Sequence, residues 1–138
     1  MSVGTPARLA VQPPELHDAA AMGYSHGVLA GPGRLLQVAG QVGEGASAAE
    51  QLDAALGGVA AVCRAAGGSM ADVTAMTWYT TDPVGSLWAD SAEVRRRWLP
   101  QPPPAMTVVQ VAGLADPGYR IEVAATAVLT APQGGNQP

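Results

Sequence analysis

The sequence predicts an α+β fold built on a single mixed sheet with two helices on one of its faces. Three features predict it: six short stretches rich in β-forming residues, two longer stretches with apolar residues at spacings of three and four, and Gly, Pro or Asp residues between them. In chain order these stretches read β-β-β-α-β-α-β-β.

The first three strands are expected at 8–12, 25–30 and 34–40. The first (RLAVQ) ends at Pro13-Pro14, because proline cannot donate to a strand ladder. The other two are joined by Gly31-Pro32-Gly33, and a short Gly and Pro connection between apolar runs is typical of a hairpin. We therefore expect these two strands to pair.

A helix is expected from near Ser47, a suitable N-cap with Glu50 as its capping-box partner, to about Ala66, before Gly67-Gly68. Its apolar residues share one face: Leu52, Leu56, Val59, Val62, Cys63 and Ala66. That position favours a small buried side chain over a nucleophile for Cys63, and a single cysteine cannot form an internal disulfide.

The second half of the chain continues the alternation of strands and helices. A β-rich run at 72–81 precedes an amphipathic helix at 86–99, and two more strands are expected at 105–112 and 120–130. Two helices cover only one face of such a sheet. The strands nevertheless contain residues too apolar to leave in water: Met76, Trp78, Val109 and Val111. We therefore expect an uncovered apolar face, which predicts oligomerisation.

Length and composition predict one globular domain over residues 1–130. The chain has 138 residues, of which 48% are hydrophobic and 13% charged. Residues 131–138 form a polar tail with no reason to fold. The formal net charge of −4 gives no basic footprint for nucleic acid, and we expect no nucleic-acid partner.

Other classes of protein and site are disfavoured by missing patterns. No stretch approaches the roughly 20 apolar residues of a membrane span, and the N-terminus lacks the apolar core of a signal peptide, so a cytoplasmic location without membrane partners is expected. Cys, His and carboxylate residues have no metal-ligand spacing. Gly31-Pro32-Gly33 lacks the lysine and helix of a phosphate loop. We expect no metal and no cofactor.

Four motifs carry a resemblance to a known family. The stretch GYSHGVLAGPGRLLQVAGQVG at 23–43 resembles the opening of the Rid family, also called YjgF, in which G-P-Y-S-Q-A precedes an apolar strand and S-G-Q. AAGGSMADVTAMTWYTTD at 65–82 is similar to the family's AAG turn and the strand after it. PPPAMTVVQVAGL at 102–114 and YRIEVAATAVL at 119–129 resemble its pro-ala-arg-thr strand and its E-I-E-A-I-A ending. Together they cover nearly the whole domain.

The resemblance implies a chorismate-mutase-like fold and a homotrimer whose small-molecule sites lie in clefts between subunits. The best-studied subgroup hydrolyses reactive enamines and imines to keto acids and ammonia. In that subgroup the arginine of the pro-ala-arg motif grips the substrate carboxylate, and a glutamate near the C-terminus positions or activates water.

Two of the family's three site residues are present at matching positions. The tyrosine falls on Tyr24 and the glutamate on Glu122, whereas Met106 stands at the arginine position. Methionine has neither donor nor charge, so it offers a soft apolar surface instead of a carboxylate anchor. Losing such a bidentate contact weakens binding of a 2-imino acid about a hundredfold or more. The usual deaminase activity is therefore not expected.

Further candidates follow from position relative to these residues. His26 is two residues from Tyr24 on an expected strand, so both share a face; it is either a second proton-transfer group or a surface histidine. His17, in a Pro-rich segment, is expected to be a loop residue. Ser91 falls near a substrate-contacting asparagine of the family. Trp78 and Trp88 are either pocket-wall or core residues.

Two functions of different class are compatible with these residues. The first is a divergent Rid-type enzyme in which Glu122, Tyr24 and His26 perform acid–base chemistry on a small imine- or enamine-like intermediate of specialised metabolism. Hydrolysis, dehydration, tautomerisation and cyclisation all suit it. The second is a non-catalytic trimer that binds a ligand or regulates a partner. Met106, Ser91, Trp78 and Trp88 would contact the small molecule in either.

Overall fold

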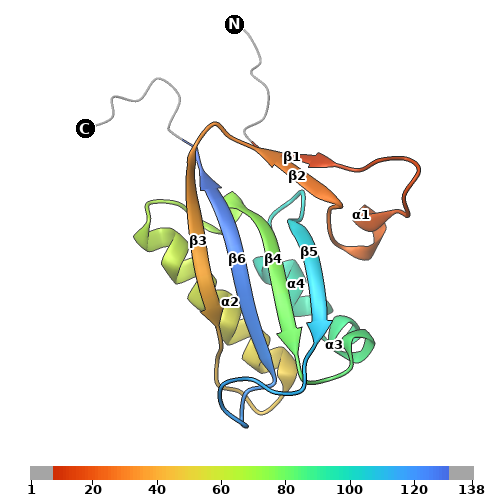
Figure 1. Cartoon of the computed structure of the whole chain (residues 1–138), viewed down its shortest axis with the longest axis vertical. Helices are drawn as coiled ribbons and strands as arrows, with labels where there is room; N and C mark the ends of the chain where they lie inside the picture. Colours follow the sequence, from red (N-terminus) through yellow and green to blue (C-terminus); the bar gives the residue numbers. More distant parts are fainter. Residues whose placement is uncertain (1–7, 131–138) are drawn as a thin grey trace, which may run out of the picture.

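The computed structural model describes residues 8–130, and these form the expected α+β fold (Figure 1). A four-stranded mixed sheet in the order β3-β6-β4-β5 is joined by a two-stranded sheet of β1 and β2. The strands are β1 (Arg8–Val11), β2 (Gly27–Ala30), β3 (Arg34–Gln41), β4 (Val73–Thr80), β5 (Ala105–Gln110) and β6 (Ile121–Leu129). The helices are α1 (Ala19–Met22), α2 (Ala48–Ala65), the 3-10 turn η1 (Met70–Asp72), α3 (Val84–Asp90) and α4 (Ala92–Trp98).

The four-stranded sheet is mixed because its edge pair β4–β5 is parallel. β4 and β5 pair from Ala75 with Ala105 to Thr80 with Gln110, whereas β6 runs antiparallel to both β3 and β4. A parallel pair requires a crossover, and α3 and α4 supply it. In Figure 1, α2, α3 and α4 lie behind the sheet, so its other face carries no helix.

The core forms between α2 and the sheet. Ser47 caps α2 as expected, since its side chain accepts a hydrogen bond from the Glu50 N–H at 3.1 Å. Leu52, Leu56 and Val59 are fully buried. Along β6, buried residues alternate with partly exposed ones, so Ile121 and Val123 face the helix and Glu122 faces away from it.

The expected hairpin between the second and third strands does not form. β2 pairs with β1, and β3 pairs with β6. At Gly33 the chain approaches β6 so closely that a Cβ would lie 2.6 Å from the Leu129 carbonyl oxygen. The turn residues therefore connect two different sheets, and the hairpin prediction was wrong.

The two sheets are tied together at the edge strand β5. The Ser25 N–H donates to the Pro104 carbonyl at 3.1 Å, and Ser25 forms an isolated parallel bridge with Ala105. On β1, Arg8 Nε donates to the Val73 carbonyl at 3.1 Å. These contacts bring the segment before β2 against the start of β5.

The expected uncovered apolar face was wrong for Met76 and Trp78 and correct for Val109, which is exposed. Met76 and Trp78, 3% and 0% exposed, lie under the helices in the core. The residues paired at Tyr79 and Glu122 occupy the opposite, open face. Leu35 and Val109 are large apolar residues that remain exposed. The open face is thus mixed in polarity.

The helix expected at 86–99 is two short helices. α3 ends at Asp90 and α4 begins at Ala92, with Ser91 between them. Ser91 is completely buried, and its hydroxyl donates to the Trp88 carbonyl at 3.2 Å. A side chain that bonds the preceding turn offers the backbone an alternative to the regular helical ladder, consistent with the break.

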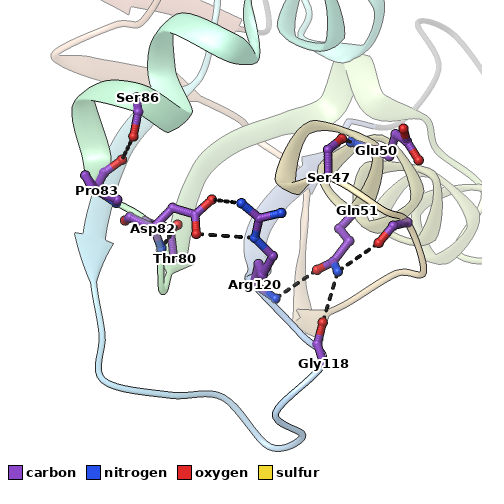
Figure 2. A network of polar contacts seen from close by, with 10 residues as sticks. Ser47, Glu50, Gln51, Thr80, Asp82, Pro83, Ser86, Gly118 and Arg120 are labelled. Carbon is purple, nitrogen blue, oxygen red and sulfur yellow. Dashed lines mark hydrogen bonds and ion pairs between the residues drawn. The ribbon is translucent and has the colours of Figure 1, made fainter.

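A polar network fixes the start of β6 (Figure 2). Arg120 forms an ion pair with Asp82, with Nη2 2.6 Å from Oδ2. Gln51, 4% exposed on α2, accepts from the Arg120 N–H at 2.8 Å and donates to the carbonyls of Gly45 and Gly118 at 3.2 and 3.0 Å. The residues that precede Glu122 are thereby held to both α2 and the end of β4.

The expected polar tail at 131–138 lies outside the described residues. Within residues 8–130, no helix combines the length and apolarity needed to cross a membrane.

Candidate functional site

An apolar pocket of about 340 Å³ lies where the edge strand β5 meets α1 and α3. We call it the Met106 pocket. It is lined by Met22, Tyr24, Val84, Gly85, Trp88, Met106 and Val108. None of these lining residues is charged, and the two side-chain polar groups among them are the Tyr24 hydroxyl and the Trp88 indole N–H. The pocket therefore suits an uncharged ligand with one hydrogen-bonding group.

Met106 enters the pocket because of its register on β5. It pairs with Met76, a core residue, so both side chains lie on the helical side of the sheet. β5 is an edge strand, and Met106 is therefore only partly buried. Met106 lines this pocket, and its contact with a ligand stays a prediction.

Trp88 forms a wall that is held on several sides. Its Nε1 donates to the Met22 carbonyl at 3.2 Å, which uses the only polar group of the ring. The Arg95 guanidinium lies 4.0 Å from the ring centroid, and Arg95 Nη2 donates to the Trp88 carbonyl at 2.9 Å. Burial, followed by the charge of Arg96, lowers the pKa of Arg95. Arg95 is not itself a lining residue of the pocket.

Trp78 and Ser91 lie behind this wall and outside the pocket lining. The Trp78 and Trp88 ring centroids are 5.5 Å apart, and Trp78 is fully buried. The Ser91 hydroxyl accepts a hydrogen bond from Arg95 Nε at 3.3 Å. In the single chain both residues thus support Trp88.

Tyr24 lies in a cluster of three rings with His17 and His26. The Tyr24 hydroxyl hydrogen-bonds His17 Nε2, and His26 Nε2 lies 2.9 Å from the His17 carbonyl oxygen. Ring centroids are 4.6 Å apart for the two histidines and 5.7 Å apart for Tyr24 and His26. His26 therefore lies beside Tyr24, as expected from their spacing.

His17 is the site residue that sequence reasoning missed. It does lie in a loop, as expected, but that loop folds back onto Tyr24. Gln12 supports the fold-back, since its Oε1 accepts from the His26 N–H at 3.0 Å and its Nε2 donates to the Tyr24 carbonyl at 3.4 Å. The presence of a histidine in this segment was the only sequence signal for this role.

Glu122 lies on the other face of the sheet from the Met106 pocket. It pairs with Tyr79 on β4 and faces away from α2, whereas Met106 is on the helical side. Gly40 of β3 lies against its carboxylate, where a Cβ would clash. Within one chain, the structure therefore brings Tyr24, His26, Met106 and Trp88 together but does not bring Glu122 to them.

A smaller depression of about 160 Å³ lies on the open face of the sheet. Its lining comes from β3, β4 and β6, and includes Gln37, Thr77 and Thr126. The Thr126 hydroxyl donates to Gln37 Oε1 at 3.0 Å. Glu122 is not part of this lining. Within the part of the chain that the structure describes, no three His, Cys, Asp or Glu residues are grouped so as to hold a metal ion.

Comparison with known proteins gives the family. The model of the endoribonuclease L-PSP family matches residues 12–129. No curated protein matches the chain significantly. Among solved structures, a Rid-family protein of unknown function from Yersinia pestis is similar over 90% of this chain and 100% of its own, with 29% identity and a TM-score of 0.78.

Two further solved structures are also similar to this chain. A member of the YjgF family from Mycobacterium tuberculosis has 32% identity and a TM-score of 0.65, covering 88% of this chain and 99% of its own. RidA from an Antarctic Psychrobacter has 30% identity and a TM-score of 0.64, covering 77% and 88%. The matched family model, the fold and these relatives together show that this chain belongs to the Rid/YjgF (endoribonuclease L-PSP) family.

Proposed function

We propose that this protein is a Rid-family enzyme that performs acid–base chemistry on a small, uncharged imine- or enamine-like intermediate, and that it is not a 2-imino acid deaminase. The observation that carries this proposal is the lining of the Met106 pocket, which includes no positively charged side chain. A carboxylate entering it would lose its hydration without gaining a partner, which is unfavourable. A neutral, flat molecule would instead contact the Met106 sulfur and the Trp88 ring.

Tyr24 supplies the hydrogen bond that such a molecule needs. Tyr24 lines the pocket, and its hydroxyl is hydrogen-bonded to the His17 ring. A phenol beside an imine nitrogen can donate the proton that the nitrogen gains as its double bond is attacked. His26 adds a second titratable ring to the same cluster.

Glu122 completes the chemistry from a second subunit. Because it lies on the opposite sheet face from Tyr24, the proposed cleft lies between the copies of a homotrimer. Exposed Leu35 and Val109 on the open face support packing against another copy. In hydrolysis, the Glu122 carboxylate takes a proton from water, the water oxygen bonds to the imine carbon, and Tyr24 protonates the nitrogen. Glu122 then gives its proton to the nitrogen while the new hydroxyl loses its proton to water, so the C–N bond breaks, amine and carbonyl product leave, and the Glu122 carboxylate is restored. Solvent returns the proton that Tyr24 gave up.

The test measures hydrolysis of two imines by the purified protein. The first is the uncharged benzylidene methylamine, and the second is 2-iminopropionate released by an amino-acid dehydratase. We expect acceleration of the first only. Glu122→Gln should remove about 99% of that acceleration, since general acid–base groups contribute on the order of a hundredfold, while assembly stays unchanged.

Two results would contradict the proposal. Efficient hydrolysis of 2-iminopropionate by the wild-type protein would show that Met106 does not exclude carboxylates. Ligand binding without turnover, unaffected by Glu122→Gln, would instead favour a non-catalytic binding trimer.

A further inference from the structure

The loop between β1 and α1 places His17 against the hydroxyl of Tyr24, the tyrosine of the Met106 pocket. Tyr24 follows α1, and His17 precedes it, so a turn of helix separates them along the chain. Asp18 caps that helix, with Oδ1 accepting from the Ala21 N–H at 3.1 Å, and the Tyr24 N–H donates to the Ala19 carbonyl at 3.1 Å. These two hydrogen bonds fix both ends of the turn, so α1 brings His17 and Tyr24 together.

His17 and Tyr24 differ in their exposure to solvent, which matters for proton transfer. His17 is exposed, whereas Tyr24 is partly buried at the pocket. An exposed imidazole exchanges protons with water, and imidazole is the side chain that does so near neutral pH. The hydrogen bond between His17 Nε2 and the Tyr24 hydroxyl therefore connects solvent to the pocket.

We propose that His17 is a positioning residue that orients the Tyr24 hydroxyl and renews its proton from solvent. The inference rests on the proposed function, because it assumes that Tyr24 gives a proton to the substrate. In the step, the Tyr24 proton moves to the substrate nitrogen while the proton on Nε2 of the His17 imidazolium moves to the Tyr24 oxygen. His17 is left neutral, and water returns its proton afterwards.

The neighbouring titratable groups are engaged elsewhere and leave this pair intact. A carbonyl oxygen only accepts hydrogen bonds, so His26 donates its Nε2 proton to the His17 carbonyl and not to the His17 ring. The Asp18 carboxylate is used by the helix cap. Among described residues, the Tyr24 hydroxyl is thus the side-chain group that hydrogen-bonds the His17 ring.

The first test needs no substrate. Proton NMR compares the ring signals of His17 at one pH in the wild type, in Tyr24→Phe and in the control Tyr119→Phe, a tyrosine outside the cluster. We expect the His17 ring signals to shift in Tyr24→Phe and to stay in place in Tyr119→Phe. Unmoved His17 signals in Tyr24→Phe would overturn the pairing.

The second test uses benzylidene methylamine hydrolysis. We expect His17→Ala to lower kcat about tenfold or more, with KM within about twofold, because the acid loses its proton supply. His17→Gln can still orient the phenol but cannot titrate, so its kcat should be intermediate and the pH profile flatter. Free imidazole should restore turnover to His17→Ala but not to Tyr24→Phe.

The outcomes separate this inference from the proposed function. Normal turnover by His17→Ala, or a loss that imidazole does not restore, would overturn the role of His17 and leave the enzyme assignment standing. No turnover by the wild type, with His17 ring signals that still respond to Tyr24→Phe, would overturn the assignment and the proton transfer with it, while the pairing would stand.

Discussion

The guanidinium of Arg95 lies 4.0 Å from the centre of the Trp88 ring and also donates to the Trp88 backbone carbonyl. One residue thus holds both the main chain and the side chain of the pocket wall. Gly23, with a positive φ of 93°, makes room for it, since a Cβ there would lie 2.9 Å from Arg95 Nη1.

Replacing Arg95 with Met should loosen this wall. The variant keeps much of the aliphatic stem but loses the cation over Trp88 and the bond to its carbonyl, at an expected cost of about 1–2 kcal/mol. Urea unfolding measures the loss, and indole fluorescence reports the combined environment of the three tryptophans. Arg96→Met is the matched control, because Arg96 is exposed and its 3.8 Å contact with Glu93 is a surface pair. Equal effects of the two variants would contradict the role of Arg95.

Met106→Arg should introduce affinity for carboxylates. A guanidinium at the pocket wall can bind a carboxylate in bidentate fashion, so binding of 2-oxobutyrate, a stable stand-in for 2-imino acids, should rise about tenfold or more. Isothermal titration calorimetry provides the measurement. Met106→Leu keeps the pocket apolar and should bind no more 2-oxobutyrate than the wild type. If Met106→Arg gains nothing, residue 106 does not control charge selectivity.

Gln51→Leu should lower the free energy of unfolding more than the same substitution at an exposed glutamine does. The Gln51 side chain makes three hydrogen bonds, to Gly45, Gly118 and Arg120, and is buried. Leucine would leave those partners unsatisfied, at about 2–3 kcal/mol. Gln110→Leu, at an exposed position on β5, serves as the control in urea unfolding. A similar free energy of unfolding for both variants would mean that the network contributes little.

The Asp53→Asn variant should lose less free energy of unfolding at acidic pH than the wild type does. Trp98 Nε1 and Arg97 Nη1 donate to Asp53 Oδ1 at 2.7 and 2.6 Å, and the Trp98 hydrogen bond is the main reason that the pKa of Asp53 is lowered. A carboxylate with a lowered folded pKa stabilises above its unfolded value, near 4, and that contribution is lost as pH falls through the folded pKa. The wild type should therefore lose more stability than Asp53→Asn below about pH 4. The effect is small because the Asp53 side chain is 39% exposed and solvent screens its contacts, and thermal unfolding at several pH values measures it.

Local patterns predicted most elements of this fold. The Ser47 cap, the apolar face around Leu56 and the strand expected at 120–130 all formed where the sequence indicated, because caps and periodicity depend on neighbouring residues. What failed was pairing at long range. Gly31-Pro32-Gly33 has the composition of a hairpin turn, but the choice between β1, β2 and β6 as partners depends on packing of the whole sheet.

The candidate site was predictable in part for the same reason. Trp78 and Tyr79 lie on opposite faces of β4, but a β-rich run does not say which face the helices cover, so Trp78 was named among the residues of the uncovered face although it lies in the core. The prediction that Met106 and Trp88 line a pocket remains compatible with the geometry. His17 could not be identified from spacing, since its contact with Tyr24 depends on the path of a loop and a helix.

The separation of Tyr24 and Glu122 onto two faces of the sheet has a consequence for mixed assemblies. If a cleft takes one of these residues from each of two neighbouring chains, Tyr24→Phe and Glu122→Gln are each inactive alone but complement one another. Random co-assembly of equal amounts should regenerate about a quarter of the clefts with both native residues, since each side is native half the time. Two inactive variants, unfolded together and refolded, would then yield an active protein.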